Sequence, residues 1–269
     1  MSEILQFSID GVALWVLVLL CIGVFVASFM DAIAGGGGII SLPAYMLAFN
    51  GMPLYFMLGT NKMSAAAGTV FSTGRYIKNG YVNWRVFAPA IAFSVAGSVC
   101  GTWLQLHTPD VVLKYLLLVV LPVVAFFTLR NKNWSDVCTP MSTRRRLLIV
   151  CGAALAIGVY DGYYGPGTGT FLMLALIKGA KLDARSAAGG AKVINLASNI
   201  GGLATSISAG YVLFGVGALT ALASIAGHWM GAGLAIKNGS RIIRPAIITA
   251  LVLLLVKVVS ELLFPQFWG

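Results

Sequence analysis

Two aspartates and two lysines lie inside or next to long apolar stretches of the sequence, at Asp31, Lys62, Asp161 and Lys192. A charged side chain within a membrane-spanning segment costs at least ~2.5 kcal/mol to insert, so it usually lines a cavity or forms a pair. The aspartates could carry a coupling proton, pair with the lysines or cap a turn. The lysines could bind an anion or extend to the membrane surface. We therefore take Asp31 and Asp161 as candidate proton-coupling residues and the lysines as candidate anion ligands.

Glycine-rich stretches follow each aspartate, at residues 34–38 and 164–170. Glycine permits positive φ and close backbone approach, so each stretch should interrupt a helix and align backbone N–H groups, and a helix starting just after it favours an anion. Small residues can instead pack helices closely, which we prefer for isolated glycines such as Gly97 and Gly227. The predicted substrate-binding residues are the two stretches, the lysines and three nearby asparagines: Gly35, Gly36, Gly37, Gly38, Asn61, Lys62, Gly165, Gly167, Thr168, Gly169, Thr170, Lys192, Asn195 and Asn199.

These residues belong to an internal repeat. A shift of 130 residues superposes residues 31–104 on residues 161–234 without gaps, and 18 of the 74 positions are identical. The identities include both aspartates, both lysines and a Gly-Tyr-Val run, which apolar composition alone does not readily produce. The sequence therefore predicts two copies of one structural unit.

The elements that carry these residues must be membrane helices. Of the 269 residues, 59% are apolar and only 10% are charged, whereas about 25% of an ordinary soluble domain is charged. A membrane helix needs about 20 apolar residues, so this chain has room for 8–10 of them and for no soluble domain. We predict an all-α polytopic membrane protein with apolar runs at about 11–30, 39–58, 60–77, 86–106, 111–129, 147–160, 169–180, 186–207, 211–236 and 242–263.

The distribution of Lys and Arg predicts the orientation of these segments. Of the 18 basic residues, 14 fall in the predicted inner loops, which explains the net charge of +10 without nucleic acid as a partner. Both termini are then periplasmic, and the second copy is inverted relative to the first. The predicted units are repeat 1 at 11–130, a basic cytoplasmic loop at 131–146 and repeat 2 at 147–263. Residues 39–58 and 169–180 could be full spans or re-entrant segments.

Inverted repeats with glycine-broken helices are typical of secondary transporters, whose sites lie where the copies meet. The sequence contains no P-loop, HExxH, nucleophile elbow or strand-linked GxGxxG, so we expect no enzymatic activity, no catalytic residue and no cofactor. The four cysteines show no CxxC spacing, and no metal site is predicted. A lone histidine inside an apolar run, His228, is of secondary interest because buried histidines more often serve packing.

Several motifs also resemble a known family. Asp31-Ala-Ile-Ala-Gly-Gly-Gly-Gly-Ile-Ile-Ser-Leu-Pro43, Gly59-Thr-Asn-Lys62 and the run from Asp161 to Gly169 resemble the TauE/SafE family of sulfite exporters, also called the toluenesulfonate uptake permease family. The stretch from Ala191 to Gly202 looks like the branch described as probable membrane transporter proteins. The resemblance implies a carrier in the bacterial inner membrane that handles sulfite, organosulfonates or related sulfur compounds.

The predicted function is therefore secondary transport of a small anion across a lipid bilayer by alternating access. An anion channel is one alternative, and an intramembrane aspartyl protease using Asp31 and Asp161 is a remote one. The sequence leaves open the substrate, the direction of transport, the coupling ion and the oligomeric state.

Overall fold

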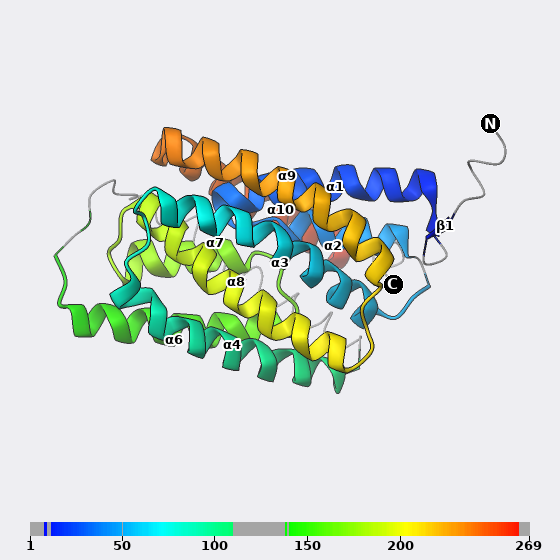
Figure 1. Cartoon of the computed structure of the whole chain (residues 1–269), viewed down its shortest axis with the longest axis horizontal. Helices are drawn as coiled ribbons and strands as arrows, with labels where there is room; N and C mark the ends of the chain where they lie inside the picture. Colours follow the sequence, from blue (N-terminus) through cyan, green and yellow to red (C-terminus); the bar gives the residue numbers. More distant parts are fainter. Residues whose placement is uncertain (1–7, 10–11, 50, 110–137, 139, 264–269) are drawn as a thin grey trace.

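The computed structural model describes residues 8–9, 12–49, 51–109, 138 and 140–263, and they form an almost entirely helical protein (Figure 1). The predicted all-α class is confirmed, apart from a hairpin of two-residue strands before the first helix. The elements are β1 (Ser8–Ile9), β2 (Val12–Ala13), α1 (Leu14–Ala34), α2 (Gly38–Ala48), α3 (Leu54–Lys78), α4 (Trp84–Leu106), α6 (Thr143–Tyr163), α7 (Thr168–Leu174), the π-helix η2 (Ala175–Gly179), α8 (Ala184–Ser208), α9 (Phe214–Asn238) and α10 (Ser240–Leu263).

Four of the described helices are long and apolar enough to cross a membrane: α1, α4, α6 and α9. Helices α3 and α8 have 25 residues each, about 37 Å at 1.5 Å per residue, but their sequences are more polar. Helix α2 has 11 residues and is about 16 Å long, and the continuous α7–η2 segment is about 18 Å long, too short for the ~30 Å hydrocarbon core. These two apolar segments are therefore not full spans.

The predicted apolar run at 39–58 does not form one element. Helix α2 ends at Ala48 and α3 begins at Leu54 after Pro53, so the run covers two helices and the turn between them. The predicted run at 111–129 and the end of repeat 1 fall in residues 110–137, outside the described part of the chain.

The order of elements recurs along the chain. Helices α1, α2, α3 and α4 are followed by α6, α7, α8 and α9, and the bounds of α3 and α8 differ by the same 130 residues as the sequence repeat. In Figure 1, α1 starts at the right-hand end of the molecule and α6 at the left-hand end, so these two helices run in opposite directions. Contacts between the two series are reciprocal: α1 packs on α9 and α4 on α6, while α3 contacts α9 and α8 contacts α4.

Glycines allow the closest of these contacts. A Cβ on Gly97 of α4 would lie 2.5 Å from the carbonyl oxygen of Leu155 on α6, and one on Gly227 of α9 would clash with the carbonyl of Phe25 on α1. The packing role predicted for Gly97 and Gly227 is confirmed.

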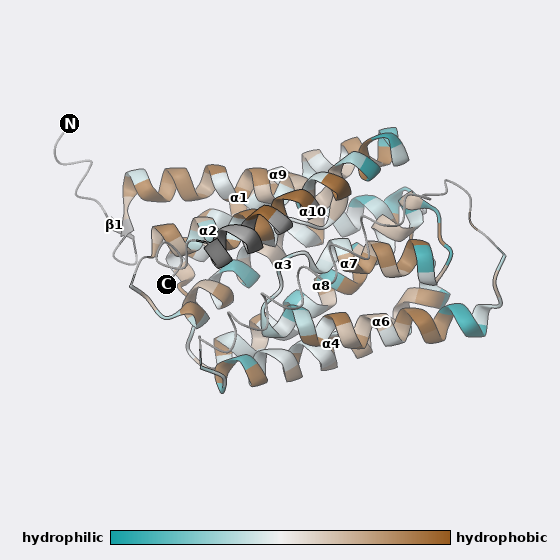
Figure 2. Ribbon diagram, turned by 180° about the vertical axis from the view of Figure 1, so that it is seen from behind, coloured by the Kyte–Doolittle hydropathy of each residue, from teal (hydrophilic) through white to brown (hydrophobic). Residues whose placement is uncertain are grey.

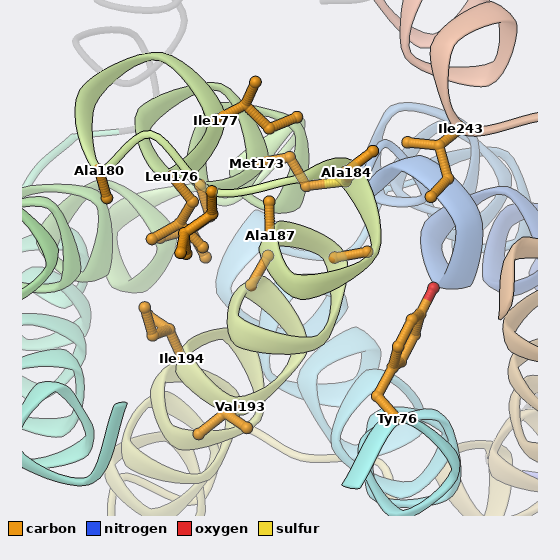
Figure 3. Packing of buried hydrophobic residues seen from close by; sticks show 14 of the residues in the cluster. Tyr76, Met173, Leu176, Ile177, Ala180, Ala184, Ala187, Val193, Ile194 and Ile243 are labelled. Atoms are coloured by element: carbon orange, nitrogen blue, oxygen red, sulfur yellow. The ribbon is translucent and has the colours of Figure 1, made fainter. Parts of the chain in front are cut away.

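Apolar side chains cover the outside of the bundle as well as its core. Figure 2 shows hydrophobic residues along the outer helices, and Trp15, Leu148 and Leu222 are each more than half exposed. Such surfaces suit lipid hydrocarbon. One buried cluster joins α3, η2, α8 and α10 through Tyr76, Leu176, Ile194 and Ile243 (Figure 3). Helices α3 and α8, which carry the candidate lysines, are thereby fixed inside the protein.

Candidate functional site

Both glycine-rich stretches interrupt helices, as the sequence predicts. Helix α1 ends at Ala34 and is followed by Gly35 with a φ of 78°, and α7 begins after Gly167, whose φ is 81°. The two breaks touch: the Thr170 N–H donates to the Gly35 carbonyl at 3.1 Å, and the Thr170 hydroxyl donates to the Ala34 carbonyl at 2.9 Å. A Cβ on Gly35 would clash with the backbone of Gly169. Glycine is therefore required here by both the backbone conformation and the contact.

The two lysines pair with the two aspartates across the repeat. Lys62 Nζ of α3 donates to Asp161 Oδ2 of α6 at 2.8 Å, and Lys192 Nζ of α8 donates to Asp31 Oδ2 of α1 at 2.5 Å. Each lysine thus binds the aspartate of the other copy. Lys62 and Lys192 are only 6% and 1% exposed, which excludes an extension of either side chain to the membrane surface.

Each aspartate has further partners. The Ser198 hydroxyl donates to Asp161 Oδ2 at 2.8 Å, while Asp31 accepts the Gly37 N–H at 3.2 Å and lies 3.2 Å from Nε2 of His228. Of the three roles considered for the aspartates, pairing is confirmed for both and capping for Asp31. Proton coupling stays a prediction.

The surroundings of the two ion pairs differ at two positions that are equivalent under the repeat. The positions equivalent to Ser98 and Ser198 under the 130-residue shift are His228 and Gly68. Ser98 donates to the Ser198 carbonyl at 2.6 Å. On the other side, a Cβ on Gly68 would clash with the His228 ring, so the glycine makes room for the imidazole. The Asp31 side therefore has a titratable group that the Asp161 side lacks.

A polar cavity of about 60 Å³ lies where the two glycine breaks and the paired charges meet. This volume is enough for a few water molecules. Most of the predicted site residues line it: Asp31, Gly35, Gly37, Gly38, Asn61, Lys62, Asp161, Gly165, Thr168, Gly169, Asn195 and Asn199.

Four predicted residues are not part of the lining, namely Gly36, Gly167, Thr170 and Lys192. Lys192 does not line the cavity itself, but it is paired with Asp31, which does. Polar residues that the sequence analysis did not select also line it: Ser28, Ser41, Ser64, Thr102, Gln105, Tyr164, Ser206 and His228. Hydroxyl and amide side chains are common in membrane helices, so only the histidine carried a distinguishing signal.

The buried charges balance. Among the described residues at the site, two lysine ammonium groups face two carboxylates, and these four charges sum to zero. Hydroxyl and amide groups supply further hydrogen-bond donors for an anionic ligand. The described residues contain no group of three or more His, Cys, Asp or Glu placed to hold a metal ion.

Comparisons with known proteins agree with this architecture. The family model described as "Sulfite exporter TauE/SafE" matches residues 19–258. The chain is 33% identical to probable membrane transporter protein ORF9 of Sinorhizobium sp over 94% of this chain and 95% of the relative. It is also 33% identical to a probable membrane transporter protein of Haemophilus influenzae, over 91% and 94%, and to YfcA of Escherichia coli K12, over 82% and 81%. No solved structure matches. The chain therefore belongs to the TauE/SafE family of membrane transporters.

Proposed function

We propose that this protein is a secondary transporter of a small anion, sulfite or an organosulfonate or a related sulfur compound, in the cell inner membrane. The family description supports the sulfur oxyanion class. The cavity supports a small anionic ligand, since its lining combines Lys62 with the amide groups of Asn61, Asn195 and Asn199. A sulfonate or sulfite group presents several acceptor oxygens, which match such donors without a metal.

The main support for this proposal is that each lysine pairs with the aspartate of the other copy. Each pair links one copy of the repeat to the other. In an inverted repeat that works by alternating access, the copies move against each other around a fixed site, so these links are the contacts that such a motion loosens. The opposite directions of α1 and α6 support the inverted arrangement (Figure 1).

An anion can then compete with a carboxylate for its lysine. When the anion binds Lys62, Asp161 loses part of its counter-charge, because that carboxylate is paired with the same ammonium group. We therefore propose that anion binding is linked to proton uptake at Asp31 or Asp161, or at a side chain in contact with one of them. Proteolysis is less well supported, because aspartyl proteases share a proton between two adjacent carboxylates, whereas each carboxylate here faces an ammonium group.

Binding and counterflow measurements test the proposal. The Lys62→Met variant should bind sulfite or methanesulfonate more weakly by about 1.5–3 kcal/mol, the scale of one charged hydrogen bond. Lys192→Met should weaken binding less, because Lys192 does not line the cavity. Lys78→Met is the matched control, since Lys78 lies on the same helix as Lys62 but is exposed. Parent-like affinity in the Lys62→Met variant would contradict the cationic site.

In proteoliposomes, unlabelled anion on the far side should accelerate uptake of labelled anion. A channel shows no such trans-stimulation, so uptake without it would favour the channel alternative.

A further inference from the structure

We propose that His228 binds the proton that allows the cavity to accept a monoanion, with one proton taken up at Nδ1 for each anion bound. This inference rests on the proposed function and assigns the coupling proton to the Asp31 side of the site. There Asp31 holds the ring through Nε2.

The charge balance of the site calls for such a group. The two ion pairs sum to zero, so a monoanion entering the cavity adds an uncompensated negative charge in a setting of low dielectric constant. A buried charge is tolerated when a counter-charge accompanies it. His228 lines the cavity, is 1% exposed, and gains one positive charge on protonation. Imidazole is the side chain whose charge changes most readily in this way.

The hydrogen bonds around the ring satisfy both protonation states. Nδ1 lies 3.1 Å from the carbonyl oxygen of Ser224 and 3.3 Å from its hydroxyl. A protonated Nδ1 donates to the carbonyl, whereas an unprotonated Nδ1 accepts from the hydroxyl. The Ser224 oxygen also accepts from Ser28 at 2.9 Å, so it keeps a partner in either case. We assign the ring proton of the neutral imidazole to Nε2, because a carboxylate such as Asp31 only accepts. A second proton can then arrive at Nδ1 or leave it with rotation of one hydroxyl.

The surroundings of the ring are sparse in ionisable groups. Helix α1 presents Asp31, which α8 holds through Lys192, and α3 presents the uncharged Thr69 hydroxyl 3.4 Å from Nε2. Lys62 of α3 also lines the cavity but is paired with Asp161 of α6. Among the described residues, no ionisable group of α2 or α10 is recorded within hydrogen-bonding distance of the ring. Protonation of His228 thus changes the charge of this cluster from zero to one.

The Asp161 side has no equivalent. Serine replaces the histidine there, and the Ser98 hydroxyl is committed to a backbone carbonyl. The chain has two histidines, and the other, His107, is exposed at the end of α4 and bonded to the Trp103 carbonyl. The exchange of Gly68 and His228 for Ser198 and Ser98 accordingly gives the site one titratable imidazole and a stoichiometry of one proton.

The test measures methanesulfonate binding to the full-length protein in detergent by calorimetry, from about pH 5.5 to about 8.5. Methanesulfonate stays ionised throughout, so any pH dependence belongs to the protein. In the parent, Kd should rise toward tenfold per pH unit on the alkaline side of the imidazole titration. In His228→Gln binding should be weak and nearly independent of pH, whereas the control His107→Gln should behave as the parent.

Nitrogen NMR of the His107→Gln protein provides a second measurement, because His228 is then its single histidine. Its imidazole should gain a proton as the pH falls, and methanesulfonate should move that transition to higher pH. Binding in the parent that does not vary with pH, or an imidazole whose charge state stays constant with and without methanesulfonate, would overturn the role of His228. Absence of methanesulfonate binding at every pH would instead contradict the proposed function.

Discussion

Removing the two lysines one at a time should reveal that the two buried ion pairs are unequal. The perturbations are Lys62→Met and Lys192→Met, which keep most of each side chain's volume and delete its charge. Breaking a buried pair by removing one partner costs about 3–5 kcal/mol, because the other charge remains buried without compensation. The loss should depend on which other groups still contact that carboxylate.

The remaining partners differ for the two aspartates. After Lys62→Met, Asp161 keeps the Ser198 hydroxyl, so the loss should be about 3–5 kcal/mol. After Lys192→Met, Asp31 keeps the Gly37 N–H and the His228 ring, which in its charged form supplies a hydrogen bond of about 1.5–3 kcal/mol. With His228 charged, we therefore expect Lys192→Met to be less destabilising than Lys62→Met by about 1.5–3 kcal/mol.

The assay is reversible unfolding in mixed detergent micelles with increasing dodecyl sulfate, followed by tryptophan fluorescence. Lys78→Met, an exposed change on the same helix as Lys62, should have little effect. The double variant Lys62→Met with Asp161→Asn should recover much of the loss, because it removes the orphaned charge. Losses below about 1 kcal/mol for both single variants would refute the reasoning, since that is the size of an exposed ion pair. A larger loss of stability for Lys192→Met than for Lys62→Met would refute the claim that Asp31 keeps better hydrogen-bond partners than Asp161.

Two further predictions concern the glycine break and the orientation of the chain. Gly35→Ala should destabilise the protein clearly more than Gly51→Ala. Both glycines have positive φ, which costs an alanine about 1–2 kcal/mol, but of the two only Gly35 faces another backbone. Unfolding in the same micelles compares the two variants, and equal losses of stability would contradict the contact. The uncharged turn at 208–210 is predicted to be periplasmic, and the basic loop after α3 is predicted to be cytoplasmic. On a cysteine-free background in intact cells, an impermeant maleimide should therefore label Ser208→Cys and not Asn79→Cys. Labelling of the Asn79→Cys variant alone would reverse the orientation.

Local signals in the sequence predict much of this fold. A glycine-rich stretch marks each of the two helix breaks, and the 130-residue repeat relates the bounds of α8 to those of α3. The hydropathy pattern does less well at residues 39–58, because the turn-favouring residues Asn50, Gly51 and Pro53 are too few to interrupt the apolar run. It also undervalues α3 and α8 as long helices, since their polar residues face other helices instead of lipid.

The candidate site is less predictable than the helices that hold it. The sequence identifies Asp31, Lys62, Asp161 and Lys192, but it does not specify which lysine meets which aspartate, because pairing depends on how distant helices pack. The role we propose for His228 depends on such contacts too. Its signal is a histidine in place of a serine, and only the three-dimensional arrangement places that ring between Asp31 and Ser224.

Because the ion pairs join the two copies, the two partners of each pair are synthesised at different times. Asp161 lies 99 residues after Lys62 in the chain, and Lys192 lies 161 residues after Asp31. At about 5–20 residues per second, α3 emerges from the ribosome roughly 5–20 s before the carboxylate that will neutralise its lysine. The earlier helices therefore wait as an incomplete assembly with unmatched charges. A message truncated after α4 produces a fragment that contains Asp31 and Lys62 but neither of their final partners, so it cannot form either ion pair of the complete protein.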